Sequence, residues 1–225
     1  MRFAVLLSGG LDSVVNLKCA VDEGTVEMAV TFDYGQAAAE NELYAAKECA
    51  RRFGVDQTVV DLGDYWGLLP EPMRNAAKAA KYDSRLGSDS GKLLREAWIP
   101  NRNGVFVNIA AAFAESRGAD AVVIGLNREE AEVFPDNSER FLKRVNDALK
   151  VSTLSGVKAV SFTTHLSKRE IVRLGIEKQA PLDIIYSCYK GSADRRMCGE
   201  CQSCVRLKLA LKAEGYEGLN PRFVR

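Results

Sequence analysis

Residues 3–21 read FAVLLSGGLDSVVNLKCAV, and the middle of this stretch decides the fold. Phe3–Leu7 is a run of five apolar residues that predicts a buried strand, and Val14–Val21 has the apolar spacing of a helix. Between them, Ser8–Ser13 holds two glycines, two serines and an acid. Gly9 and Gly10 permit positive φ, so backbone amides there can approach an anion closely. Because the first amides of the next helix also favour phosphate, this loop predicts a phosphate-binding site.

The spacing of the loop separates it from two common nucleotide-binding motifs. A Walker loop needs G-x-x-x-x-G-K-[ST], and this loop has no lysine; it does not match G-x-G-x-x-G either. We expect Asp12 or Ser13 to cap the helix that follows. A plain glycine turn before a capped helix is the alternative interpretation.

Strands and helices continue to alternate along the chain. Apolar runs predict strands at 28–32, 58–62, 121–125 and 157–162, and helical spacing predicts helices at 36–53, 105–117, 138–150 and 167–178. Almost wholly apolar strands that alternate with helices indicate a parallel sheet covered on both faces. We therefore predict a doubly wound, five-stranded α/β domain over residues 1–186, with its ligand beyond the carboxyl ends of the strands.

Residues 63–103 interrupt this alternation. The segment is polar, contains Pro70, Pro72 and Pro100, and has only a short helix-like piece near 73–81. About forty residues without a strand is too long for an ordinary connection in a compact domain. We interpret the segment as a lid over the substrate.

Length and composition narrow the class of protein. A chain of 225 residues suits one large domain, or one domain with a small appendage. The net charge of +1 does not favour stable binding to nucleic acid. The first apolar run is too short for a signal-peptide core, and no run reaches the ~18 apolar residues of a membrane span. We expect a cytoplasmic protein with no membrane partner.

The cysteines are concentrated near the end of the chain. Four of the six follow C-x9-C-x2-C-x2-C, at Cys188, Cys198, Cys201 and Cys204. Four thiolates at this spacing match a closed tetrahedral zinc site with a structural role, so residues 187–225 are predicted to form a small zinc-binding region. A set of ordinary buried cysteines is the alternative.

A nucleic-acid-binding zinc module is the rival interpretation of this region. Basic residues surround the cysteines at Arg195, Arg196, Arg206, Lys208 and Lys212. The balanced charge of the whole chain argues against it. The single histidine, His165, precedes a predicted helix and is interpreted as a surface or capping residue.

The motifs also carry a family resemblance. S-G-G-x-D-S after a first strand resembles the pyrophosphate loop of the N-type ATP pyrophosphatases, which have the adenine nucleotide alpha hydrolase-like fold and cleave ATP to AMP and pyrophosphate. Together with the cysteines, the chain resembles the 7-cyano-7-deazaguanine synthases of queuosine and archaeosine biosynthesis. The matching segments are Ser8–Ser13, Phe32–Gln36, Ile99–Asn103, Gly125–Asn127, Phe134–Asp136, Leu166–Lys168 and Ser187–Tyr189.

The resemblance implies a set of site residues. Asp12, Ser13, Arg102 and Lys168 would be catalytic, with Asp12 organising magnesium. Phe134, Asp136 and Asn127 would bind the substrate: Phe134 stacking on a deazapurine ring and Asp136 accepting hydrogen bonds from its guanine-like edge. ATP would be bound by Leu7, Ser8, Gly9, Gly10, Leu11, Asp12, Ser13, Val14 and Asp33.

Each of these roles has a structural alternative. Asn103 could be only a helix cap, Lys168 a solvated residue of a first helical turn, and Arg102 a member of a surface ion pair. Pro135–Ser138 could be only a turn that caps the next helix.

The implied reaction is an ATP-dependent ligation. ATP would adenylate 7-carboxy-7-deazaguanine, free ammonia would displace AMP to give an amide, and a second adenylation would permit dehydration to the nitrile. The resemblance also implies a homodimer. The chain departs from the family pattern at Ala37–Ala39, where a basic pair is common, and at Ser138, where an arginine is common. A related pyrophosphatase that activates a different carboxylate is therefore the alternative.

Overall fold

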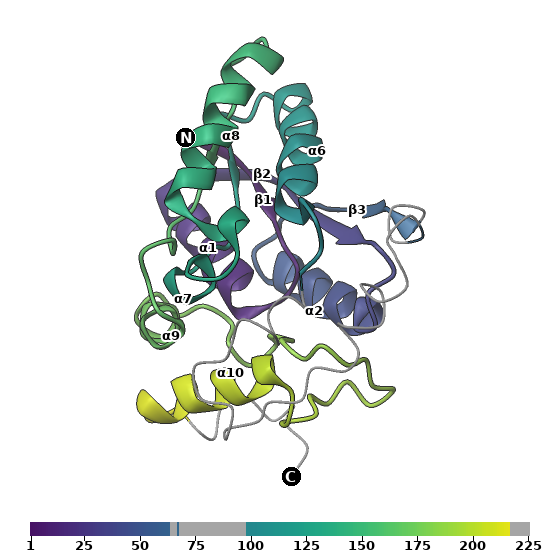
Figure 1. Ribbon diagram of the computed structural model, residues 1–225, viewed down its shortest axis with the longest axis vertical. Helices are drawn as coiled ribbons and strands as arrows, with labels where there is room; N and C mark the ends of the chain where they lie inside the picture. The colour runs from purple at the N-terminus through teal and green to yellow at the C-terminus, as the bar shows by residue number, and fades with distance from the viewer. Residues whose placement is uncertain (64–66, 68–97, 217–225) are drawn as a thin grey trace.

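The computed structural model describes residues 1–63, 67 and 98–216 (Figure 1). Nearly all of the segment interpreted as a lid, including the helix-like piece near 73–81, lies outside the described residues. Within the described part, the helices are all too short or too polar to cross a membrane.

A five-stranded parallel sheet forms the centre of the molecule. Its strands are β1 (Arg2–Leu6), β2 (Thr25–Asp33), β3 (Gln57–Asp61), β4 (Ala121–Val123) and β5 (Lys158–Val160). They lie in the order β3-β2-β1-β4-β5, and every neighbouring pair is parallel. The predicted five-stranded parallel sheet is confirmed, although β2 begins earlier than predicted and β5 ends two residues sooner, at Val160 rather than Phe162.

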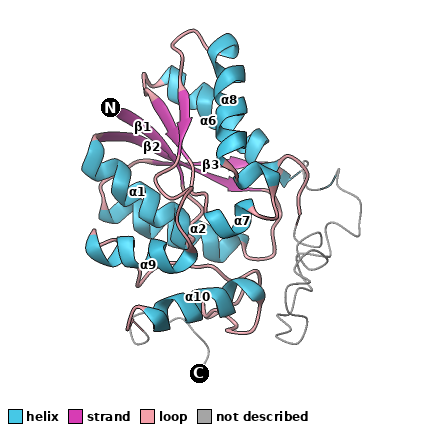
Figure 2. Cartoon of the chain, turned by 60° about the vertical axis from the view of Figure 1, so that its left-hand side comes forward, coloured by secondary structure: helices cyan, strands magenta, loops and turns pink. Residues whose placement is uncertain are grey.

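Helices cover both faces of this sheet (Figure 2). α1 (Leu11–Glu23), α2 (Ala39–Arg52) and α9 (Lys168–Glu177) pack on one face, and α6 (Arg102–Ser116) and α8 (Glu139–Ser152) pack on the other. Period-two alternation within the strands explains this arrangement. Phe3 and Val5 belong to the buried cluster of the first face, whereas Ala4 and Leu6 belong to that of the second. The predicted double coverage is confirmed.

The helix starts follow local side-chain chemistry. Ser138 caps α8 by accepting a hydrogen bond from the amide of Phe141 at 3.1 Å. Ser167 and Glu170 form a capping box at α9. The cap predicted for the first helix is wrong, since α1 begins at Leu11 after Gly10 and has no side-chain cap. Two helices were not predicted: α7 (Arg128–Ala131) and α10 (Gln202–Ala213). The alternative interpretation of Pro135–Ser138 as a turn that caps the next helix is confirmed, since the 3-10 turn η2 (Pro135–Asn137) leads directly into α8.

The strand order reverses at β1, which lies between β2 and β4. In open parallel sheets, ligands bind beyond the carboxyl ends of the strands at such a switch point. The loops after β1 and β4 meet there, because a Cβ added at Gly125 would lie 2.8 Å from the amide nitrogen of Ser13. The glycine–serine loop therefore occupies the position where a ligand is expected.

The C-terminal segment packs on the same core as the sheet. Cys188, Met197 and Leu207 belong to the buried cluster that also contains Leu11. The amide of Tyr186 donates to the carbonyl of Gly9 at 2.9 Å, which ties the segment to the loop after β1. The domain boundary at residues 186 and 187 remains a prediction.

Candidate active site

The loop after β1 is held by its own serines and by close packing. Gly9 has φ +79°, and a Cβ there would lie 2.8 Å from Cβ of Ala45. The Ser8 and Ser13 hydroxyls lie 3.2 Å apart, and Ser13 Oγ also donates to the Gly10 carbonyl at 3.0 Å. Because α1 lacks a side-chain cap, the amides of its first turn remain available to an anion.

Asp12 lies in the first turn of α1 and faces inward. Its Oδ2 accepts from Nδ2 of Asn127 at 2.7 Å. Its Oδ1 is buried and has no hydrogen-bond partner among the residues that the structure describes. Burial raises the pKa of Asp12, and the positive charge of Lys168 opposes that rise. A cation bound at Oδ1 would satisfy this orphaned oxygen.

Three adjoining cavities open around this loop. The loop cavity is lined by residues that include Ser8, Gly10, Leu11, Asp12, Ser13, Asn103, Gly125 and Lys168. The aromatic cavity is lined by residues that include Leu7, Val30, Phe32, Phe106 and Ile124. The ring cavity is lined by residues that include Tyr34, Trp98, Phe134, Asp136 and Tyr189. Arg102 and Glu42 line all three, so the cavities form one connected site.

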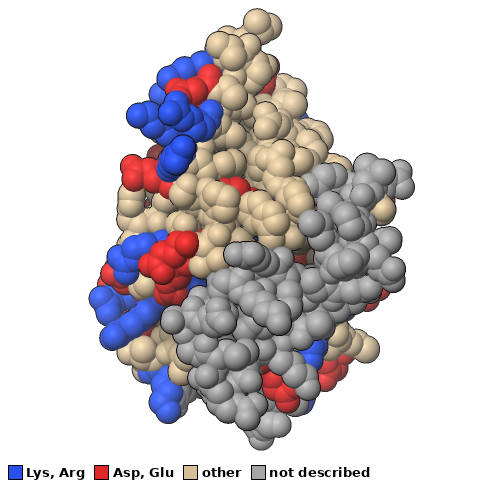
Figure 3. All heavy atoms as spheres, viewed as in Figure 1, with Lys and Arg blue, Asp and Glu red and all other residues tan. Residues whose placement is uncertain are grey.

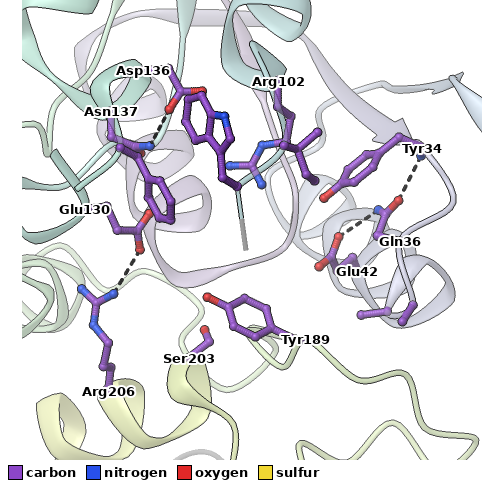
Figure 4. Close-up of a pocket in the computed structure, with 15 residues that line it drawn as sticks. Tyr34, Gln36, Glu42, Arg102, Glu130, Asp136, Asn137, Tyr189, Ser203 and Arg206 are labelled. Carbon is purple, nitrogen blue, oxygen red and sulfur yellow. Dashed lines mark hydrogen bonds and ion pairs between the residues drawn. The ribbon is translucent and has the colours of Figure 1, made fainter. Parts of the chain in front are cut away.

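Arg102 lies at the start of α6 and points into the middle of the site (Figure 4). Its Nε donates to Oδ1 of Asn103 at 3.3 Å. Burial alone would lower the pKa of Arg102, but the facing groups Tyr34 and Asp136 raise it. The guanidinium is therefore a fixed positive charge that both the loop cavity and the ring cavity share.

Lys168, the first residue of α9, is buried rather than solvated, with 7% of its surface exposed. Its Nζ lies 3.6 Å from Oε1 of Glu130, and Nη1 of Arg206 lies 3.6 Å from the same oxygen. Arg206 also pairs with Glu129 at 2.5 Å. Burial alone would raise the pKa of Glu130, but Lys168 and Arg206 lower it. This chain of charges joins α7, α9 and α10 beside the loop.

Phe134, which precedes the 3-10 turn η2, and Asp136, which lies within it, both line the ring cavity. The Phe134 ring stacks near Trp98, with centroids 5.7 Å apart and planes 16° from parallel. Asp136 accepts from the Asn103 amide at 3.3 Å and from Nδ2 of Asn137 at 3.1 Å. Burial raises the pKa of Asp136, with Arg102 opposing the rise. The cavity thus offers an aromatic face next to a carboxylate.

Most of the predicted site residues line these cavities, and four do not. Leu7, Ser8, Gly10, Leu11, Asp12, Ser13, Arg102, Lys168, Phe134 and Asp136 come together there. Gly9 packs against α2, and Val14 is fully buried in the core. Asp33 accepts from the Gly35 amide at 3.1 Å, within its own turn. Asn127 is fully buried and caps α7 by accepting from the Glu130 amide at 2.9 Å, so it positions Asp12 and Glu130.

Several lining residues carry no assignment from the sequence. Glu42 lies in the first turn of α2, and its Oε2 accepts from Nε2 of Gln36 at 3.0 Å. Tyr189, Ser203 and Arg206 reach the ring cavity from the C-terminal segment (Figure 4). In the sequence, Tyr189 lies in the matching segment Ser187–Tyr189 and Arg206 lies among the basic residues near the cysteines, whereas Glu42 and Ser203 are marked by no motif.

The four clustered cysteines fit a zinc ion. Their Sγ atoms all lie within 4.8 Å of one another, with Cys188 and Cys198 3.5 Å apart and Cys198 and Cys204 3.9 Å apart. Zinc–sulfur bonds of about 2.3 Å in a tetrahedron place the sulfurs about 3.8 Å apart. All six cysteines lie in the described part of the chain, and none forms a disulfide.

The sequence matches a known family over most of its length. The family model described as "Queuosine biosynthesis protein QueC" matches residues 2–215. This chain belongs to the QueC family. The match includes the loop after β1, the ring cavity and the four cysteines, so QueC membership covers every part of the site described above.

Curated relatives agree with QueC membership. A 7-cyano-7-deazaguanine synthase from Pelotomaculum thermopropionicum is 44% identical, over 96% of this chain and 99% of the relative. One from Carboxydothermus hydrogenoformans is 45% identical, over 92% and 96% of the two chains. One from the archaeon Methanosarcina mazei is 40% identical, over 96% of both.

Proposed function

We propose that this chain makes 7-cyano-7-deazaguanine from 7-carboxy-7-deazaguanine, ammonia and ATP. It would do so through adenylated intermediates, with release of AMP and pyrophosphate. The observation that carries the proposal is the continuity of the site: Arg102 lines both the loop cavity and the ring cavity. A carboxylate on a ring bound beside Phe134 can therefore reach a phosphate held by the loop. QueC membership and the names of the relatives support the same reaction.

The loop cavity suits the phosphates of ATP. Ser8, Ser13 and the first amides of α1 offer donors, and Lys168 adds a buried positive charge. Magnesium bound with ATP would neutralise charge on the leaving pyrophosphate, and the orphaned Oδ1 of Asp12 is the oxygen that fits it. The protein's own contribution is mainly positioning and stabilisation of charge.

The ring cavity suits a flat, guanine-like ring. Phe134 offers an aromatic face, and the carboxylate of Asp136 can accept hydrogen bonds from ring donors. Ser138, where relatives of this pattern commonly have arginine, caps α8 and is not among the residues that line the ring cavity. Arg102 and Arg206 supply guanidinium groups on that wall instead. The departure at Ser138 therefore does not count against a deazapurine carboxylate.

Zinc in the cysteine cluster would have a structural role. Four thiolates fill a tetrahedral shell and leave no open position for substrate. The segment that it would hold together carries Tyr189, Ser203 and Arg206 into the ring cavity. Zinc would therefore support the wall of the site without contacting the reacting atoms.

Two observations favour a small-molecule enzyme over a nucleic-acid-binding module. Arg206 forms ion pairs with Glu129 and Glu130, and the Arg195 guanidinium lies 3.9 Å above the Tyr44 ring. On the face shown in Figure 3, basic side chains lie next to acidic ones rather than forming one uniform patch. We also propose that the enzyme is cytoplasmic, as expected from the sequence, and homodimeric, as the family resemblance implies.

The test is product analysis with a matched pair of variants. Purified protein is incubated with ATP, ammonium and 7-carboxy-7-deazaguanine, and the products are identified by mass spectrometry. We expect nitrile, AMP and pyrophosphate from the wild type, and a large loss of nitrile for Asp136→Asn. The control is Asp147→Asn, on the exposed surface of α8. If the wild type leaves this acid unchanged but consumes ATP with another carboxylate, the substrate assignment is wrong.

A further inference from the structure

We propose that Glu42 binds the incoming ammonium ion and acts as the general base for the nitrogen chemistry. This inference rests on the proposed function, since it names the proton acceptor for that reaction. Glu42 lines the loop, aromatic and ring cavities, so it borders the point where a bound carboxylate and a bound nucleotide would meet. Gln36 holds Oε2 at 3.0 Å, and within the described residues no hydrogen bond engages Oε1.

The other carboxylates of the site are less suited to accept a proton. Glu130 is paired with Lys168 and Arg206, which lower its pKa. Both oxygens of Asp136 accept hydrogen bonds. Asp12 is bonded to Asn127 and is the group that fits magnesium. Glu42 is the remaining cavity carboxylate among the residues that the structure describes.

The reaction needs such a group, because ammonia is mostly protonated at neutral pH. Glu42 would take one proton from ammonium, which frees the nitrogen lone pair for attack on the adenylated carboxyl carbon. A second proton leaves the nitrogen as the C–O bond to AMP breaks, which gives the amide. After adenylation of the amide oxygen, both N–H protons are lost and AMP departs with the electron pair of the C–O bond. These losses give the nitrile. Between steps, Glu42 returns each proton to solvent.

The surroundings of Glu42 raise its pKa towards the value that a base needs at neutral pH. Burial raises its pKa to about 7, and this effect exceeds the opposing effects of Gln36 and Arg102. The negative charge of Asp33, at the end of β2, also raises the pKa. A base with a pKa near the working pH combines a useful ionised fraction with a real affinity for protons. Amide formation should therefore increase as pH rises through about 7.

The experiment separates adenylation from nitrogen transfer in Glu42→Gln. Gln keeps an acceptor for Gln36 but cannot take a proton. ATP–pyrophosphate exchange driven by 7-carboxy-7-deazaguanine, without ammonium, reports adenylation alone, and we expect it to fall far less than amide formation. Amide and nitrile formation with ammonium should fall by about 10²-fold or more at neutral pH. The wild-type rate should level off once Glu42 is ionised, above pH about 7, whereas the rate of the variant should keep rising with the fraction of free ammonia. Glu40→Gln, an exposed neighbour near the start of α2, is the matched control.

Hydroxylamine supplies the decisive second readout. It is largely uncharged at neutral pH, so it needs no base before attack, and hydroxamate formation by Glu42→Gln should approach the wild-type rate. Two results would overturn the proposal: normal amide formation by Glu42→Gln, or equal losses of exchange, amide and hydroxamate, which indicate a structural role. If the wild type shows no exchange with this acid, the proposed function fails and the inference fails with it.

Discussion

Replacement of Gly9 by alanine tests the packing of the phosphate loop. Gly9 has φ +79°, a conformation that costs an alanine about 1–2 kcal/mol. The new Cβ would lie 2.8 Å from Cβ of Ala45, 2.8 Å from the amide nitrogen of Ala46 and 2.9 Å from the carbonyl oxygen of Glu42. These neighbours are backbone or short side chains of α2, so they cannot move aside without shifting the helix.

The size of the effect follows from these two terms. Gly54 provides the matched control, since it has φ +65° and a Cβ there would meet nothing within 4 Å. Gly54→Ala should lower the free energy of unfolding by about 1 kcal/mol, because part of the strain is offset by reduced freedom of the unfolded chain. Gly9→Ala adds an overpacking cost of about 1–3 kcal/mol. At roughly 2–4 °C per kcal/mol for a domain of this size, the melting temperature should fall by about 4–16 °C for Gly9→Ala and about 2–4 °C for Gly54→Ala.

Thermal and urea unfolding, followed by circular dichroism, measure both variants. The free energies of unfolding should differ by at least ~1 kcal/mol, with Gly9→Ala the less stable. Because Gly9 lies in the loop whose Ser8 and Ser13 line the loop cavity, Gly9→Ala should weaken ATP binding, whereas Gly54→Ala should not. Equal destabilisation by the two substitutions would show that the loop does not pack against α2 as described.

Three further predictions concern the metal, ATP and pH. Elemental analysis should find about one zinc per chain, and Cys201→Ser should lose it together with most of the folded C-terminal segment; a fully folded protein without thiophilic metal would contradict this. Chromatography should show AMP and pyrophosphate, not ADP, as the products of ATP, and Asp12→Asn should abolish their formation while the melting temperature stays close to that of the wild type. The folded-state pKa of Glu42, about 7, exceeds its ordinary value, so stability should fall as pH rises from about 4.5 to 7. In Glu42→Gln that decline should be smaller, and identical pH profiles of urea unfolding for the two proteins would refute the assigned burial.

The sheet could be predicted because each strand has a strong local signal. Phe3–Leu7 is wholly apolar, and a parallel strand buried on both faces requires that pattern. The position of the glycine–serine loop could also be predicted, because a predicted strand precedes it and a predicted helix follows it. By contrast, α7 is only four residues long, and so short an element gives no helical period to detect.

The rest of the site depends on contacts between distant parts of the chain. Arg206 and Glu129 are 77 residues apart, and no local pattern pairs them. Asn127 was placed correctly near the switch point, but the sequence does not show that its amide points to Asp12 rather than to substrate. The role of Asp33 in ATP binding stays a prediction, and the structure adds that its side chain accepts from the Gly35 amide within its own turn.

The contribution of the C-terminal segment to the ring cavity has a consequence for how the enzyme is made. All five strands end by Val160, so they leave the ribosome before the C-terminal segment does, and the sheet can begin to form first. The C-terminal segment emerges later, with its four clustered cysteines and with Tyr189, Ser203 and Arg206. Tyr189 and Ser203 line the loop cavity as well as the ring cavity, so the nascent chain makes its glycine–serine loop well before either cavity is complete. Newly made protein should therefore bind neither the nucleotide nor the ring fully until this segment has docked on the sheet.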